Sequence, residues 1–102
     1  MAFIQSAVVT FTLPTTYADG TTPWPAANYG SATVFRNGSQ IGTVTGPALT
    51  YTDALVPIGT NSYTVEVIDK VTNLTSAASA AVTYTQVGQP PGAPVITSIV
   101  AT

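Results

Sequence analysis

Apolar side chains recur at every second position in several short runs, and this alternation most constrains the fold of the chain. In AVVTFTLP, residues 7–14, Val9, Phe11 and Leu13 fall on one side and the intervening residues on the other. Residues two apart share a face of a β-strand, whereas a helix face requires spacings of three and four. Gly, Pro and Asn separate the runs, and no stretch of the 102 residues has helical periodicity. The pattern therefore predicts an all-β protein.

Four further segments complete the predicted set of strands. Segment 29–45 predicts a hairpin, because Asn37-Gly38 at its centre readily adopts the positive φ angles of a type I′ turn. Segments 48–53, 62–69 and 79–85 predict a short strand, a longer strand and a final core strand. We expect these three strands to bury one face through its apolar residues, namely Leu49, Tyr51, Tyr63, Val65, Val67, Val82 and Tyr84.

Charged side chains are scarce, at 6% of the chain with a net charge of −2. Two cations cannot neutralise several phosphates, so we expect no nucleic-acid partner and no polybasic attraction to a membrane. The first ten residues, MAFIQSAVVT, lack the basic and apolar regions of a signal peptide. No apolar run is long enough to predict a membrane-spanning helix.

The chain contains no histidine and no cysteine. The commonest general base, a Ser-His-Asp triad, a thiolate nucleophile and a disulfide framework are therefore excluded. Two of the four carboxylates, Glu66 and Asp69, are predicted to lie on opposite faces of a strand. We predict no enzymatic activity, no cofactor and no metal site, since each needs polar groups that converge.

Residues 15–30, TTYADGTTPWPAANYG, form the one long loop of the predicted fold. Trp24 lies between two prolines, which have no N–H to donate and do not belong in a central strand. Two interpretations are open for this loop. The indole folds back to close the end of the core, or the loop contacts a partner through Trp24 and Tyr29. Both residues are candidate partner-binding residues on the second interpretation.

A series of motifs begins at the predicted hairpin turn. It starts with FRNG at 35–38, continues with Tyr51 and Asp53, and passes a corner at 55–60. The later matching positions are Tyr63, Val65, Val67, Asp69, Asn73, Ser76, Ser79 and Val82. This order resembles the latter half of a fibronectin type III or related immunoglobulin-like domain of bacterial and phage proteins. The resemblance implies an immunoglobulin-like antiparallel β-sandwich of about seven strands, and a fold alone does not indicate a function.

The C-terminal segment GQPPGAPVITSIVAT, residues 88–102, combines a Pro-rich hinge with an uncharged, strand-like run. Domains of the resembled family begin with the form P.AP.I.S, which occurs here at 91–100 instead. A bare apolar strand promotes aggregation, so we expect this arm to pair with its own domain, a neighbouring copy or another protein. Its candidate partner-binding residues are Val95, Ile96, Ile99 and Val100.

Together these features predict a β-sandwich domain over 1–86 and a hinge with a C-terminal β-arm over 87–102. A small β-sandwich without catalytic groups is similar to phage capsid decoration (cement) proteins, which bind a capsid lattice in many copies. We therefore expect a structural protein on the capsid surface of a virion, a dimer or trimer whose partner is a capsid or other structural protein. The alternatives are a fibronectin type III spacer or binding module of a larger extracellular bacterial enzyme or adhesin, and a carbohydrate-binding module with Tyr17, Trp24 and Tyr29 exposed.

Overall fold

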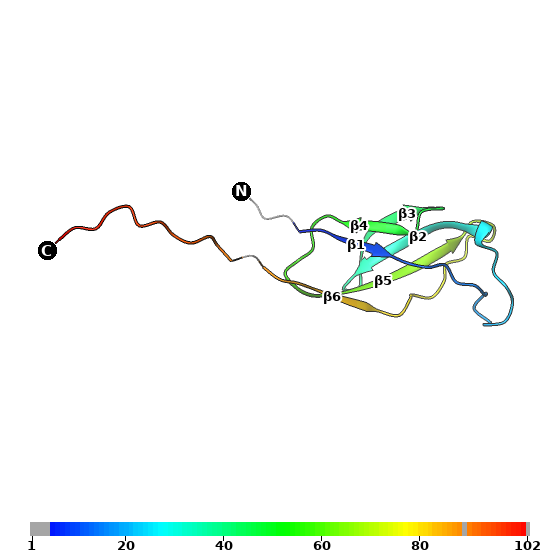
Figure 1. Cartoon of the computed structure of the whole chain (residues 1–102). Helices are drawn as coiled ribbons and strands as arrows, with labels where there is room; N and C mark the ends of the chain where they lie inside the picture. The colour runs from blue at the N-terminus through cyan, green and yellow to red at the C-terminus, as the bar shows by residue number, and fades with distance from the viewer. Residues whose placement is uncertain (1–4, 89, 102) are drawn as a thin grey trace.

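The computed structural model describes residues 5–88 and 90–101, and this part of the chain is built from β-strands (Figure 1). The strands are β1 (Ala7–Thr10), β2 (Tyr29–Arg36), β3 (Ser39–Thr45), β4 (Thr50–Asp53), β5 (Gly59–Asp69) and β6 (Val82–Gln86). One 3₁₀ turn, η1 (Ala26–Asn28), ends the long loop directly before β2. The all-β prediction is confirmed, although the described residues form six strands where about seven were expected.

The strands form two antiparallel sheets. The larger sheet has the order β3–β2–β5–β6, and β1 pairs with β4 in the smaller sheet. β5 is the longest strand, with 11 residues, and buried and half-buried positions alternate along most of its length. Tyr63, Val65 and Val67 occupy buried positions, as the alternation in segment 62–69 predicted.

The two sheets pack against each other around one apolar core. The buried part of the core consists of Trp24, Tyr29, Ala32, Val34, Val44, Tyr63, Val65 and Val67. The half-buried side chains that pack against it are Val9, Phe11, Leu13, Ile41, Leu49 and Tyr51. The rings of Phe11 and Tyr29 meet edge to face, with centroids 6.5 Å apart and planes at 85°, an arrangement that aromatic pairs favour.

Asn37 and Gly38 join β2 to β3 in a two-residue turn with φ angles of 53° and 83°. Positive φ at both positions is characteristic of the type I′ turn, so the predicted hairpin is confirmed. The Asn37 side chain also connects this turn to β5. Its Oδ1 accepts a hydrogen bond from the Ser62 N–H at 2.9 Å, and its Nδ2 donates to Oδ1 of Asn61 at 3.1 Å.

β6 is the strand whose predicted burial is wrong. Val82 lies directly opposite Tyr63 of β5, and Tyr84 lies opposite Asn61, and both β5 residues are buried. Directly opposite residues have side chains on the same face, so Val82 and Tyr84 point to the inner side of the sheet as predicted. They are nevertheless 69% and 42% exposed. A smaller sheet of two strands faces a larger sheet of four, and in the described residues it leaves β6 uncovered.

Residues 90–101, called the tail below, form no strand in this single chain, and all of them are exposed. The tail leaves the two sheets beyond β6 and runs away from them (Figure 1). The molecule therefore measures 83 Å along its longest axis and only 20 and 18 Å across it. Of the three modes of pairing expected for the arm, pairing with its own domain is not seen in the described residues.

Candidate functional site

In the described part of the chain, β1 has one backbone edge without a partner strand. Among the described residues, only β4 pairs with β1. Beyond the end of β1, the Phe11 N–H donates a hydrogen bond to the Leu49 carbonyl at 3.0 Å, on the side of β4. Alternate residues of an antiparallel strand direct their N–H and C=O groups to opposite edges, so Val8 and Thr10 direct theirs away from β4. Such an edge is a template for a further strand.

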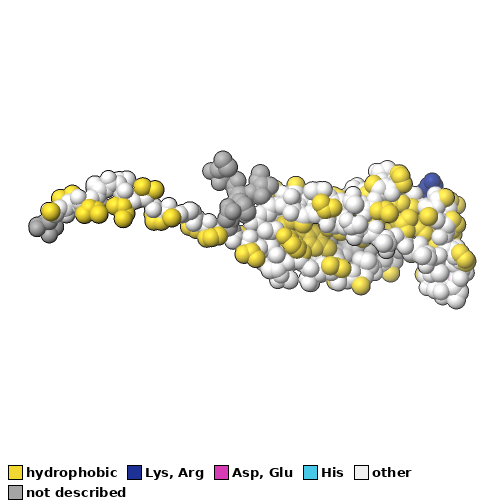
Figure 2. All heavy atoms as spheres, viewed as in Figure 1, with side chains coloured by type: hydrophobic (Ala, Val, Ile, Leu, Met, Phe, Trp, Pro, Cys, Tyr) yellow, Lys and Arg dark blue, Asp and Glu magenta, His cyan; other side chains and the backbone are white. Residues whose placement is uncertain are grey.

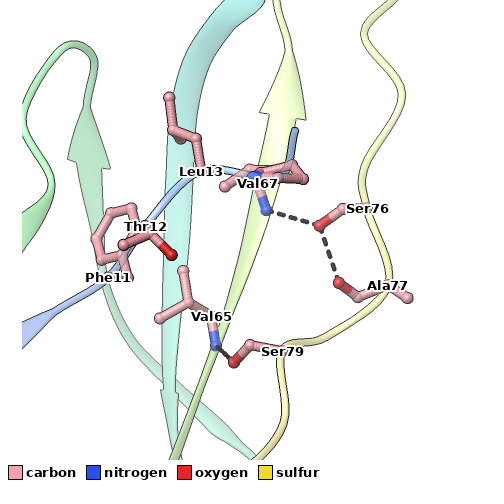
Figure 3. A pocket seen from close by; sticks show the side chains of 9 residues that line it. Phe11, Thr12, Leu13, Val65, Val67, Ser76, Ala77 and Ser79 are labelled. Atoms are coloured by element: carbon pink, nitrogen blue, oxygen red, sulfur yellow. Dashed lines mark hydrogen bonds between the residues drawn. The ribbon is translucent and has the colours of Figure 1, made fainter. Parts of the chain in front are cut away.

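A hollow of about 270 Å³ lies beside the continuation of β1 (Figure 3). Residues 11–14, which continue β1, line one side, and segment 76–79, which leads toward β6, lines the other. Val65 and Val67 of β5 lie between these two sides. None of the lining side chains is charged, so the hollow suits an apolar occupant.

Ser76 and Ser79 hold the second side of the hollow against β5 (Figure 3). The N–H groups of Val67 and Val65 donate to the Oγ atoms of Ser76 and Ser79 at 2.9 and 3.0 Å. In return, the serine N–H groups donate to the carbonyls of the same valines at 2.8 and 2.9 Å. The serine hydroxyls accept the hydrogen bonds that backbone carbonyls would accept in a regular β-ladder. Segment 76–79 therefore runs beside β5 without forming a strand.

The tail carries the candidate residues Val95, Ile96, Ile99 and Val100, each at least 79% exposed. Figure 2 shows hydrophobic side chains along the length of the tail, and its sequence contains no charged residue. In an extended chain, Val95 and Ile99 point to one side and Ile96 and Val100 to the other. The tail therefore presents two branched apolar side chains on each face.

Trp24 and Tyr29 lie in the core, which corrects their assignment to a partner-binding surface. They are 8% and 6% exposed, so neither ring offers apolar area to a partner. Nε1 of Trp24 donates to Oδ2 of Asp69 at 2.9 Å, and the Tyr29 hydroxyl donates to the Ala48 carbonyl at 2.8 Å. The indole closes the core, as the other interpretation of the loop held. An exposed row of Tyr17, Trp24 and Tyr29 is excluded for the same reason.

Asp69 at the end of β5 is an acceptor that organises the chain around it. Besides the Trp24 indole, the N–H groups of Val71 and Thr72 donate to its Oδ1 at 2.8 and 3.2 Å. The hydrogen bond from Trp24 is the largest cause that lowers the pKa of Asp69 below its ordinary value of 3.8. The hydrogen bonds from the backbone lower this pKa further. An ionised carboxylate with this many internal donors has a structural role.

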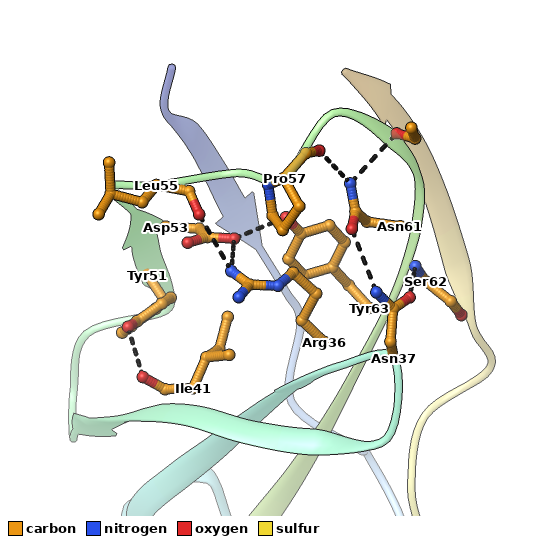
Figure 4. A network of polar contacts seen from close by, with 11 residues as sticks. Arg36, Asn37, Ile41, Tyr51, Asp53, Leu55, Pro57, Asn61, Ser62 and Tyr63 are labelled. Atoms are coloured by element: carbon orange, nitrogen blue, oxygen red, sulfur yellow. Dashed lines mark hydrogen bonds and ion pairs between the residues drawn. The ribbon is translucent and has the colours of Figure 1, made fainter. Parts of the chain in front are cut away.

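Arg36, Asp53 and Tyr63 form a polar cluster that connects β2, β4 and β5 (Figure 4). Nη1 of Arg36 lies 2.7 Å from Oδ2 of Asp53, and the Tyr63 hydroxyl donates to the same oxygen at 2.7 Å. Burial acts to raise the pKa of Asp53, but the hydrogen bonds from Arg36 and Tyr63 outweigh it and lower the pKa. Burial and the Asp53 carboxylate raise the pKa of Tyr63 to about 12. The cluster therefore joins the two sheets, and its groups are engaged with one another.

Residues 5–88 and 90–101 contain no group of three or more Asp, Glu, His or Cys side chains that could hold a metal ion. The same residues include no helix with the length and apolar character needed to cross a bilayer.

Comparisons of the chain with models of known protein families, with curated proteins and with solved structures found no match. The candidate functional features of the described residues are the open edge of β1, the hollow and the exposed tail.

Two features of the site had unequal signals in the sequence. The open edge of β1 was indicated by the strand form P.AP.I.S, which stands at 91–100 and not before segment 7–14. The contact of Arg36 with Asp53 had none, since two opposite charges 17 residues apart match no periodic pattern.

Proposed function

We propose that this chain is a non-enzymatic structural protein of a virus particle, a capsid decoration protein that binds and stabilises a capsid in many copies. Its two packed sheets are then an immunoglobulin-like sandwich of the fibronectin type III kind, as the resemblance of residues 35–85 implies. The observation that carries the proposal is the uncharged tail, whose four large apolar side chains are at least 79% exposed in the single chain. Exposed apolar surface of this extent marks a contact with another molecule.

The chemistry of the described residues supports an assembly role. The buried carboxylates, Asp53 and Asp69, are each occupied by internal donors. The tail and the hollow offer backbone hydrogen bonds and apolar area, which are the means by which a strand adds to a sheet.

The test is to probe particles and secreted material of the source culture with antibodies against the purified chain. Particles are banded on a density gradient and washed in high salt before immunoblotting. We expect a band near 10.4 kDa that follows the major capsid protein in a constant ratio. Absence of the band from washed particles, with the epitope in another fraction, would reject the proposal.

A second candidate function is a spacer or binding module of a larger bacterial extracellular enzyme or adhesin. The observation that favours it is the course of the tail, which follows a Pro-rich hinge and runs along the long axis of the molecule (Figure 1). A linker to a further domain has this composition and direction. In the same immunoblot, this function predicts the epitope in the secreted fraction, on a polypeptide much larger than 10.4 kDa.

A further inference from the structure

We infer that the tail of one copy of this chain adds to β1 of a second copy as an antiparallel strand. The acceptor, called the slot below, consists of the open edge of β1, the hollow beside it and the uncovered inner face of β6. This inference goes beyond the proposed function, because a protein that binds a capsid need not bind itself.

The slot has room for one more strand of the smaller sheet. A strand added at the open edge of β1 lies about 4.8 Å from it, on the side away from β4. That position lies over the hollow between residues 11–14 and 76–79, and toward β6. Val82 and Tyr84 point to the inner side of β6 and are exposed because nothing described covers them. One added strand therefore pairs the edge, fills the hollow and covers β6.

The tail matches the slot in length and in chemistry. Residues 94–101 and residues 7–14 are segments of equal length. Neither the tail nor the lining of the hollow carries a charged side chain, so no charge is desolvated when they meet. Whichever face of the tail turns inward, two branched apolar side chains reach the slot: Val95 with Ile99, or Ile96 with Val100.

The direction of the tail indicates a second copy as the donor. Nε2 of Gln5 donates to the Val87 carbonyl at 3.0 Å, so the start of β1 lies beside the end of β6. A tail that folded straight back at its hinge would run parallel to β1 of its own chain. A tail that continues away from its own sheets instead reaches a second copy that has the same orientation. It meets that copy at the C-terminal end of β1. It then runs antiparallel to β1, and the antiparallel ladder is the more stable of the two.

This geometry predicts the symmetry of the assembly. In a two-fold dimer with exchanged tails, each tail would enter from the end where β1 starts and would run parallel to it. Antiparallel addition relates the copies head to tail, which is a heterologous contact. Such contacts produce an open series of oligomers or a closed ring, and a trimeric ring is compatible with them.

Disulfide trapping tests the contact directly, because the native chain contains no cysteine. Acceptor variants carry Val8→Cys, Thr10→Cys or Thr12→Cys, all at exposed positions on the outer side of β1 and its continuation. Donor variants carry Thr97→Cys or Ser98→Cys, which lie on opposite faces of an extended tail. Each acceptor is mixed with each donor under mild oxidation, and the mixed disulfide is measured by mass spectrometry.

We expect one of the two donors to form the mixed disulfide with the β1 series at least about fivefold more than the other, because neighbouring strand residues face opposite sides. Thr52→Cys on β4 and Thr83→Cys on β6 are the controls, since both are exposed strand positions away from the open edge of β1. Equal trapping at a control, equal trapping by both donors, or no trapping at β1 would overturn the inference.

Sedimentation over a range of concentrations provides the second measurement. The full-length protein should form head-to-tail oligomers, and a double variant, Ile96→Asp with Ile99→Asp, should remain monomeric. Ala93→Asp, in the hinge outside the strand-like run, is the matched control and should assemble. The tail is exposed and makes no hydrogen bond to the sheets in the described residues, so these variants leave the fold intact. A wild-type protein that stays monomeric, or that stops at a two-fold dimer, would contradict head-to-tail addition, whatever the particle immunoblot shows.

Discussion

Nε1 of Trp24 donates a hydrogen bond of 2.9 Å to Oδ2 of Asp69, which lies 45 residues later in the chain. The bond connects the long loop to the end of β5 inside the core. Burial of the apolar ring and the hydrogen bond of the indole N–H together hold Trp24 in the core. The hydrogen bond matters because a buried N–H without an acceptor is unfavourable. A tryptophan between two prolines is thus a structural residue in this chain.

Trp24→Ala is expected to lower the free energy of unfolding by about 3–5 kcal/mol, the usual cost of removing a buried aromatic side chain. Urea unfolding followed by circular dichroism measures this change. Tyr17→Ala, in the same loop but 40% exposed, is the control and should change the stability far less. Equal effects at the two positions would show that the indole is not part of the core.

Arg36→Met is expected to destabilise the protein by about 1–3 kcal/mol, since the Asp53 carboxylate stays buried and loses a charged donor. Lys70→Met removes the same charge from an exposed side chain and serves as the matched control. Both variants are compared by urea unfolding at pH 7. A loss as large in Lys70→Met as in Arg36→Met would mean that net charge, and not the contact with Asp53, determines the effect.

The stability should be highest between about pH 5 and 9 and should fall on both sides. The folded state lowers the pKa values of Asp53 and Asp69 below 3.8, so their contribution is present above this value and is lost as the pH falls through the folded pKa values. It raises the pKa of Tyr63 from 10.0 to about 12, so that contribution is present below pH 10 and is lost between these values. Unfolding by urea at a series of pH values tests both limbs.

Tyr63→Phe separates the two limbs of this profile. The variant lacks the titrating hydroxyl, so its loss of stability above pH 10 should be smaller than that of the wild type. Its acid limb should persist, because Asp69 does not depend on Tyr63. An alkaline limb of unchanged size would assign the loss to other groups.

The strands of the fold were predictable where local chemistry determines them. Asn37-Gly38 has positive φ at both positions, and the alternation around Val65 matches the burial of β5. Val82 and Tyr84 show the limit of this reasoning. The alternation of apolar residues correctly places both side chains on the inner face of the sheet, but burial also requires a strand of the opposite sheet above them. That strand is missing from the described part of the chain, and the sequence of 79–85 does not indicate its absence.

The candidate site was predictable only in part. The tail was identified because an uncharged, β-prone segment after a Pro-rich hinge is conspicuous in composition alone. The sequence left the position of Trp24 undecided between core and surface, because its partner, Asp69, is distant in sequence and flanking prolines are compatible with either position. The acceptor edge depends on the pairing of β1 with β4, which is a long-range property.

Gly42→Ala is expected to destabilise the protein by about 1–3 kcal/mol through overpacking. A Cβ atom at this position would lie only 2.6 Å from Cζ of Tyr51, whose hydroxyl donates to the Ile41 carbonyl at 2.8 Å. The ring must move, and this bond between the two sheets is strained or lost. Gly92→Ala in the tail, where a Cβ would meet no atom within 4 Å, is the control. Thermal unfolding of both variants should show a lower midpoint for Gly42→Ala alone.

Deleting residues 90–102 should leave the stability of the isolated monomer unchanged to within about 0.5 kcal/mol, as for other exposed sites. The described residues of this segment are exposed and contribute neither a strand nor a hydrogen bond to the sheets, whereas Val87, which accepts from Gln5, is retained. The comparison is made by urea unfolding at a protein concentration low enough to prevent assembly. At high concentration the full-length protein should gain apparent stability, because assembly binds the folded state, and the truncated protein should not. A truncated monomer that is several kcal/mol weaker at low concentration would show that the tail folds onto its own sheets.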